Sequence, residues 1–172
     1  MVVVPQGREL RGMIVCITDQ AGQPGLMVLD VASDSSTVLA SADCSWRSVP
    51  AVAPSGERVA LQGADGRLKI VNVRADQTES IGEPISGLIT PRWSPGGSSV
   101  MYELDATTHV VSLDETCGQS SFVAAMAAWM GDGSQIAYVA DNMLHAMDTW
   151  TGEAVQLTDG PERIWGVAAS LD

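Results

Sequence analysis

The chain has 172 residues, of which 45% are hydrophobic and only 17% are charged, a composition typical of a globular domain and not of a disordered segment. Its 21 acidic residues outnumber its 9 basic ones, giving a formal net charge of −12. Because a phosphate backbone and an anionic membrane surface would both be repelled, we expect no nucleic-acid partner. No apolar run reaches the length of about 18 residues that a spanning helix needs, so we expect no membrane insertion.

Taken in chain order, the predicted elements are short β-strands, and no apolar pattern of helical period persists for the length of a helix. Three strands come first, at residues 14–17, 26–30 and 36–41. The next four are centred on Val52 and lie at 59–61, 68–72 and 78–81. Four more start at Trp93 and continue at 100–102, 110–114 and 120–124. The last group starts at Trp129 and continues at 136–139, 144–148 and 154–158, with a final strand expected around Ala169.

A repeated phrase gives these strands their order, which we name a, b, c and d. The sequence Pro-Arg-Trp-Ser-Pro-Gly-Gly-Ser-Ser-Val-Met-Tyr at 91–102 matches Ala-Ala-Trp-Met-Gly-Asp-Gly-Ser-Gln-Ile-Ala-Tyr at 127–138, and a weaker copy spans 50–61. Each copy has a glycine in the turn between strands a and b, where a tight hairpin needs a positive φ: Gly56, Gly97 and Gly133. The fourth copy is split, with its front at 167–172 and its back at 12–16.

Repeats of about 40 residues indicate a solenoid or a propeller. We predict an all-β fold, a β-propeller of four-stranded antiparallel blades, with residues 1–11 as a lead-in segment and 12–172 as a single propeller domain. The four blade equivalents are expected at 12–41 plus 165–172, at 48–82, at 90–124 and at 126–159. Because both termini contribute to the split blade, we expect the C-terminal strand a to pair with the N-terminal strand b and close the ring.

The phrase from Trp93 to Tyr102, followed by a strand ending in Leu-Asp and by Leu-Thr-Asp-Gly-Pro at 157–161, resembles the TolB-type (WD-like) β-propeller repeat. The resemblance covers almost all of 12–172, with Val52 and Ala169 in place of the tryptophan and Leu171 in place of the proline. It implies a bacterial scaffold that binds proteins or ligands, in the periplasm or cell envelope or attached to a larger enzyme. Family propellers usually have six or more blades. Four blades therefore leave three alternatives: a small closed ring, two chains forming an eight-bladed ring, or a piece of a longer parent.

Most polar residues have an adequate structural explanation. Asp30, Asn72, Asp114 and Asp148 end the c strands, where such side chains accept hydrogen bonds from turn amides. The two histidines, His109 and His145, lack a serine or cysteine partner in any nucleophile motif. The repeat places Cys16, Cys44 and Cys117 too far apart to pair, and no cluster has metal-ligand spacing. We therefore expect no disulfide, metal or cofactor.

Two tryptophans, Trp46 and Trp165, fall outside the repeat consensus, in connections that lead from a strand d to a strand a. Arg47 and Arg163 lie beside them, and aromatic residues and arginine are enriched at binding hot spots. We predict a partner-binding face made of Trp46, Arg47, Arg163 and Trp165, together with Glu162 and Ile89. The alternative is that both tryptophans pack between blades and both arginines are simply solvated.

The function predicted from these observations is a non-enzymatic binding or sensor scaffold for a protein or peptide partner. The alternative is a structural assembly element whose self-association, as a homodimer with an eight-bladed ring, is its main role. A hydrolase or lyase built on a propeller is a third possibility, but it lacks a recognisable motif.

Overall fold

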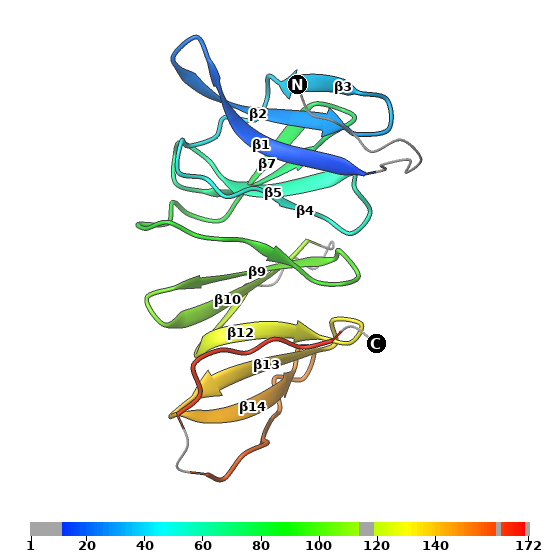
Figure 1. The fold of residues 1–172 in the computed structure, drawn as a ribbon. Helices are drawn as coiled ribbons and strands as arrows, with labels where there is room; N and C mark the ends of the chain where they lie inside the picture. Colours follow the sequence, from blue (N-terminus) through cyan, green and yellow to red (C-terminus); the bar gives the residue numbers. More distant parts are fainter. Residues whose placement is uncertain (1–11, 114–118, 161–162, 171–172) are drawn as a thin grey trace.

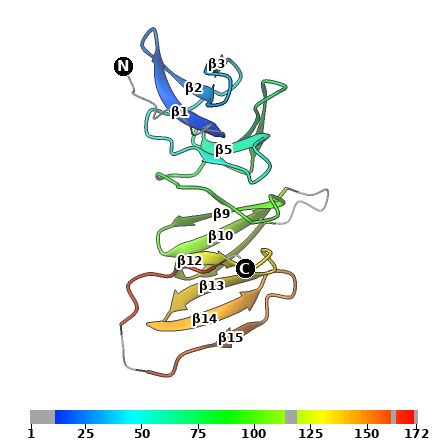
Figure 2. The ribbon, with the colours of Figure 1, turned by 45° about the vertical axis from the view of Figure 1, so that its right-hand side comes forward.

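The computed structural model describes residues 12–113, 119–160 and 163–170, and these ranges hold fifteen β-strands. They contain no helix, and so no helix long and apolar enough to cross a membrane. The strands form four separate antiparallel sheets, each built by consecutive strands joined in hairpins. The sheets are stacked face to face, from the N-terminal sheet at one end to the C-terminal sheet at the other (Figures 1 and 2).

We number the sheets as blades 1 to 4. Blade 1 contains β1 (Met13–Gln20), β2 (Gln23–Asp30) and β3 (Ser35–Leu39). Blade 2 contains β4 (Ala51–Val52), β5 (Arg58–Gln62), β6 (Leu68–Asn72) and β7 (Gln77–Ile81). Blade 3 contains β8 (Arg92–Trp93), β9 (Ser99–Leu104), β10 (Thr107–Ser112) and β11 (Gln119–Val123). Blade 4 contains β12 (Ala125–Met130), β13 (Gln135–Ala140), β14 (Met143–Asp148) and β15 (Ala154–Gln156). Every strand predicted as type b, c or d is present.

The hydrophobic core lies between the sheets. In β5, Val59 and Leu61 pack against blade 1, whereas Ala60 between them packs against blade 3. This division follows from the two-residue period of a strand, which directs alternate side chains to opposite faces of its sheet. The positions equivalent to Val59 in the next two blades, Val100 and Ile136, are likewise fully buried against the preceding blade. Each middle blade therefore contributes one strand face to each of two neighbouring cores.

The tryptophans of the repeated phrase join neighbouring blades. The indole nitrogen of Trp93 donates to the backbone oxygen of Ala51 over 2.8 Å, and that of Trp129 donates to the oxygen of Arg92 over 3.3 Å. In both cases the acceptor belongs to strand a of the preceding blade. Both tryptophans are more than nine-tenths buried, which agrees with the packing role predicted for them. This hydrogen bond explains why tryptophan suits the position better than another large apolar residue.

The turns have the chemistry that the sequence indicates. Gly56, Gly97 and Gly133 adopt φ angles of 74°, 73° and 93° between strands a and b. At the ends of the c strands, side-chain oxygens accept hydrogen bonds from amides two and three residues ahead: Asp30 from Ala32 and Ser33, Asn72 from Arg74 and Ala75, and Asp148 from Trp150 and Thr151. The remaining predicted turn aspartate, Asp114, lies outside the described residues.

The ring closure expected from the two termini is not formed in this structure. Among the described residues, β1 has β2 on one side and no hydrogen-bonded strand on the other, so blade 1 has three strands. The segment 163–170 is not a strand and runs beside β12 of blade 4, where the Gly131 amide donates to the Ser170 oxygen over 3.4 Å (Figure 1). The position at which the termini cut the repeat is a property of the sequence. Ring closure depends instead on the curvature of the whole array of sheets, and that array is open in this structure.

Candidate functional site

The connections from strand d to strand a gather at one end of the blades, beside the hairpins between strands b and c. The first connection, residues 40–50, joins the hairpin of blade 2 through the Ala64 amide and the Asp43 oxygen, 3.2 Å apart. The second connection, residues 82–91, joins the same hairpin through the Ile85 amide and the Gly66 oxygen, 3.0 Å apart. We call this end of the molecule the loop face. Rigid sheets thus hold two irregular segments on either side of one hairpin.

Gln62 holds the second connection in place. Its side-chain nitrogen lies 2.8 Å from the oxygen of Gly87 and 3.2 Å from that of Gly66, and its side-chain oxygen accepts from the Ile89 amide over 3.3 Å. The residue is only 6% exposed. Since a buried amide needs its hydrogen-bonding groups satisfied, these contacts fix the main chain of the connection relative to β5.

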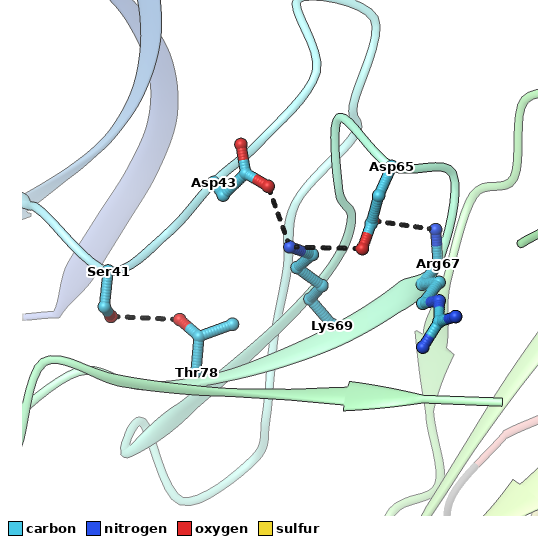
Figure 3. A network of polar contacts seen from close by, with 6 residues as sticks. All are labelled: Ser41, Asp43, Asp65, Arg67, Lys69 and Thr78. Carbon is cyan, nitrogen blue, oxygen red and sulfur yellow. Dashed lines mark hydrogen bonds and ion pairs between the residues drawn. The ribbon is translucent and has the colours of Figure 1, made fainter. Parts of the chain in front are cut away.

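A buried lysine organises the first connection. Lys69 of β6 places its ammonium nitrogen 3.0 Å from the Asp43 carboxylate and 3.6 Å from that of Asp65, although its side chain is only 7% exposed (Figure 3). Asp65 also accepts a hydrogen bond from the amide of Arg67 (Figure 3). The same connection is joined to blade 2 by a hydrogen bond between the hydroxyls of Ser41 and Thr78. Two exposed carboxylates on the loop face are therefore already bound to a cation of the protein.

The residues predicted as a binding face have different surroundings. Trp46 and Trp165 are 52% and 77% exposed, and Arg47 and Arg163 are exposed as well. Ile89 is fully buried in the core between blades 2 and 3, so it is a packing residue and we leave it out of the face. Burial depends on the neighbouring blade, which sequence position alone did not indicate. Glu162 lies outside the described residues.

The structure divides the predicted residues between two places on the array. Trp46 and Arg47 lie on the connection between blades 1 and 2, beside the hairpin of blade 2. Arg163 and Trp165 lie on the C-terminal segment, which follows blade 4 and runs beside β12 (Figure 1). No contact joins the two pairs within the described residues. A partner that touches both pairs must therefore extend along the loop face over more than one blade.

Two further exposed apolar residues lie on the same connections and were not predicted. Val49 follows Arg47 on the first connection, and Leu88 lies on the second, each 44% exposed. Leu88 and Arg47 line one cavity of about 310 Å³. The sequence does place Leu88 directly after Gly87, in a connection between strands. Nothing in the repeat, however, distinguished the exposed Leu88 from the buried Ile89 next to it.

Three cavities lie in a row on the loop face. The one lined by Arg47 and Leu88 shares Ala64 with a cavity of about 510 Å³ between blades 1 and 2. It shares Ile85 with a cavity of about 370 Å³ between blades 2 and 3. Their sizes lie within or near the range of about 300–1,000 Å³ found for ligand sites.

The two histidines stack on tyrosines, and Cys44 is buried in the core between blades 1 and 2. His109 stacks on Tyr102 with ring centroids 4.8 Å apart, and His145 stacks on Tyr138 at 5.2 Å, so the same cross-strand pair recurs in blades 3 and 4. Cys16 and Cys44 are free thiols, as predicted, while Cys117 lies outside the described residues. Burial raises the pKa of the Cys44 thiol, which disfavours the reactive thiolate. Within the described ranges, no three histidine, cysteine or acidic side chains lie close enough to hold a metal ion.

Comparison with known proteins identifies the fold. The β-propeller domain of Cps50 (Swd1) from Myceliophteria thermophila is 18% identical and superposes with a TM-score of 0.59, over 87% of this chain and 57% of that one. TolB from Acinetobacter baumannii is 15% identical with a TM-score of 0.57, over 85% of this chain and 40% of that one. A chain of the mitotic checkpoint complex is 14% identical with a TM-score of 0.58, over 81% and 45% of the two chains.

The fold is that of a TolB-type or WD-like β-propeller array. The chain spans about half the length of these similar chains, between 40% and 57%. No protein-family model and no curated protein sequence matches it. The propeller resemblance predicted from the repeated phrase is therefore confirmed at the level of fold.

Proposed function

We propose that this chain is a non-enzymatic binding scaffold that holds a protein or peptide partner on its loop face. The observation that carries the proposal is the set of exposed residues there: Trp46, Arg47, Val49, Leu88, Arg163 and Trp165. Large aromatic side chains and arginines dominate binding energies at protein interfaces, and exposed loops on a rigid scaffold carry function disproportionately. One of the similar propellers was solved as part of a complex, which supports a binding role for this chain.

A displayed library of random dodecapeptides, selected on the immobilised chain, tests the proposal. We expect enriched peptides to bind the unmodified chain and to lose at least about tenfold in affinity when Arg47→Ala and Trp165→Ala are combined, since hot-spot truncations cost more than about 1 kcal/mol each. Trp150→Ala is the matched control, because Trp150 is 94% exposed but lies in a turn between strands c and d. Selected peptides that bind the double variant and the chain equally would contradict the proposed face.

The alternative function is self-assembly, and one observation favours it. Ile14 of β1 occupies the position that Val59, Val100 and Ile136 occupy in the other blades, yet it is 54% exposed where those three are fully buried. Blade 1 thus has an apolar face of the kind that elsewhere packs against a preceding blade. In this alternative, blade 4 of a second chain covers that face and its C-terminal segment pairs with the free edge of β1, giving an eight-bladed ring.

Light scattering after size exclusion tests the alternative. A chain of 18.0 kDa should then give a particle of twice that mass, and Ile14→Lys should return it to a single chain. Trp150→Ala again serves as the exposed control. A monomeric particle at high concentration would exclude the eight-bladed ring and leave the binding function untouched.

A further inference from the structure

The cavity between Arg47 and Leu88 has a floor that leaves few groups free for a ligand. The amides of Gly63, Gly66 and Gly87 already donate to backbone oxygens. The side-chain amide of Gln62, a buried polar residue of the floor, is already hydrogen-bonded to the hairpin at Gly66 and to the second connection at Gly87 and Ile89. The side chains that remain for a ligand include those of Arg47 and Ser45 and the apolar side chains of Ile85 and Leu88.

Arg47 is one of three described basic residues, with Arg67 and Arg163, whose side chain has no hydrogen bond or ion pair within the described part of the chain, and of the three it is Arg47 that lines this cavity. Of the described bases, Lys69, Arg74 and Arg92 form ion pairs, and Arg58 donates to the Gly97 oxygen and lies over the Trp93 ring. The carboxylates of Asp43 on the first connection and of Asp65 on the hairpin are bound to Lys69. The cation at the cavity is thus available to an outside carboxylate.

The net charge of the chain limits which kinds of anionic ligand can bind at Arg47. With a net charge of −12, the protein repels a long polyanion such as a nucleic acid, whereas a single carboxylate on a short segment meets mainly the local field of Arg47. A guanidinium holds a carboxylate through two parallel hydrogen bonds, a geometry that a lysine does not provide. Leu88 lines the same cavity and is 44% exposed, so it offers apolar contact, and Trp46 and Val49, near Arg47 on the first connection, are at least 44% exposed as well.

We propose that this cavity binds an extended peptide segment of a partner in which an acidic residue lies next to a bulky apolar residue. The carboxylate pairs with Arg47, and the apolar side chain packs between Ile85 and Leu88. This inference rests on the proposed scaffold function and gives it a chemical class of partner. It assigns the specificity to the connections on either side of blade 2, and not to the C-terminal pair Arg163 and Trp165.

Two fluorescein-labelled synthetic peptides test the assignment by anisotropy. One has the sequence Ser-Gly-Phe-Asp-Gly-Ser and the other has asparagine in place of the aspartate. We expect the aspartate peptide to bind about tenfold more tightly, because a charge-assisted hydrogen bond is roughly twice as strong as a neutral one. Arg47→Ala should abolish that preference, and Leu88→Ser should weaken both peptides alike. Arg74→Ala is the control, since Arg74 is an exposed arginine in a turn between strands c and d.

Three results would overturn the assignment of this cavity as a site for an acidic peptide. Equal binding of the two peptides, an unchanged preference in Arg47→Ala, or no binding of either peptide would overturn it. Because Arg47, Leu88 and Arg74 are exposed, the variants should fold, and circular dichroism checks this. The scaffold function survives such a result if library-selected peptides still depend on Trp165, whereas it fails together with the assignment if the library yields no binding peptide.

Discussion

The side-chain amide of Gln62 donates to the backbone oxygen of Gly87 over 2.8 Å, and this bond joins strand β5 to the connection that carries Leu88. The same side chain accepts from the Ile89 amide and donates to the oxygens of Gly66 and Ile85, so one buried residue holds four points of the main chain. The position of the exposed Leu88 therefore depends on a buried polar residue of β5.

Replacing Gln62 with leucine should destabilise the chain by about 2 kcal/mol, because it leaves buried backbone groups without their partners. Urea unfolding measures the change. Gln156→Leu is the control, since the Gln156 side chain also donates hydrogen bonds but is exposed, and its replacement should change stability by less than about 0.5 kcal/mol. Similar losses in both variants would show that the network on the second connection contributes little.

Gly63 is a position where even one methyl group should disturb the loop face. A Cβ there would overlap the Cε of Lys69 and lie 2.6 Å from the Asp65 carboxylate. Gly63→Ala should therefore displace the ammonium group from Asp43 and cost about 1–3 kcal/mol, as overpacking usually does. Gly96→Ala is the matched control, because the nearest atom to its added Cβ is 3.9 Å away. A stability of Gly63→Ala equal to that of the control would contradict this account.

The indole hydrogen bond between blades predicts a graded response to phenylalanine. Trp93→Phe loses the 2.8 Å bond to the Ala51 oxygen and should cost about 1 kcal/mol beyond any packing change. Trp129→Phe loses a longer bond of 3.3 Å and should cost less. Trp150→Phe, in an exposed turn, should leave the free energy of unfolding unchanged. The reverse order of the first two variants in chemical denaturation would argue against an interblade role for the indole nitrogen.

Asp76 gives the contact between blades 1 and 2 a dependence on pH. Its carboxylate accepts from the amides of Ser41 and Ala40 over 3.1 and 3.2 Å, and these hydrogen bonds, that from Ser41 first, hold the pKa of Asp76 below its usual value. A lowered folded-state pKa stabilises the fold above the unfolded-state value of about 3.9, and the contribution is lost as the pH falls through the folded-state pKa.

Asp76→Asn should therefore lower the melting temperature at neutral pH, with a difference that closes in acid, below a pH of about 3.9. Asparagine suits the test because it tolerates the positive φ of 47° at this position. Glu153→Gln is the control, since the Glu153 side chain is exposed and makes no hydrogen bond in the described part of the chain. A melting difference that stays constant down to the acid limit would mean that the charge of Asp76 is not what stabilises the contact.

On the loop face, the repeat pattern predicted some of the exposed residues correctly and others wrongly. The repeat identified Trp46 and Arg47 as residues outside its consensus, and both are exposed on a connection as expected. The sequence also led us to include Ile89 in the binding face, although that side chain is fully buried between blades 2 and 3. It did not mark Leu88, the neighbour that is exposed. Connections follow no fixed period, so which of two adjacent apolar residues faces inward depends on contacts such as that of Gln62 with the Ile89 amide.

The amino-acid sequence by itself determined the strands, their hairpins and the turn chemistry, because a two-residue apolar period, a glycine at a positive φ and an aspartate that accepts turn amides all act within a few residues. Gly97 and Asp148 behave as their positions indicate. Only the tertiary structure decided which faces are covered and where the segment 163–170 lies, since among the described residues no strand pairs with the outer edge of β1 and this segment lies beside β12. Those features depend on the curvature of four stacked sheets, which no local pattern specifies.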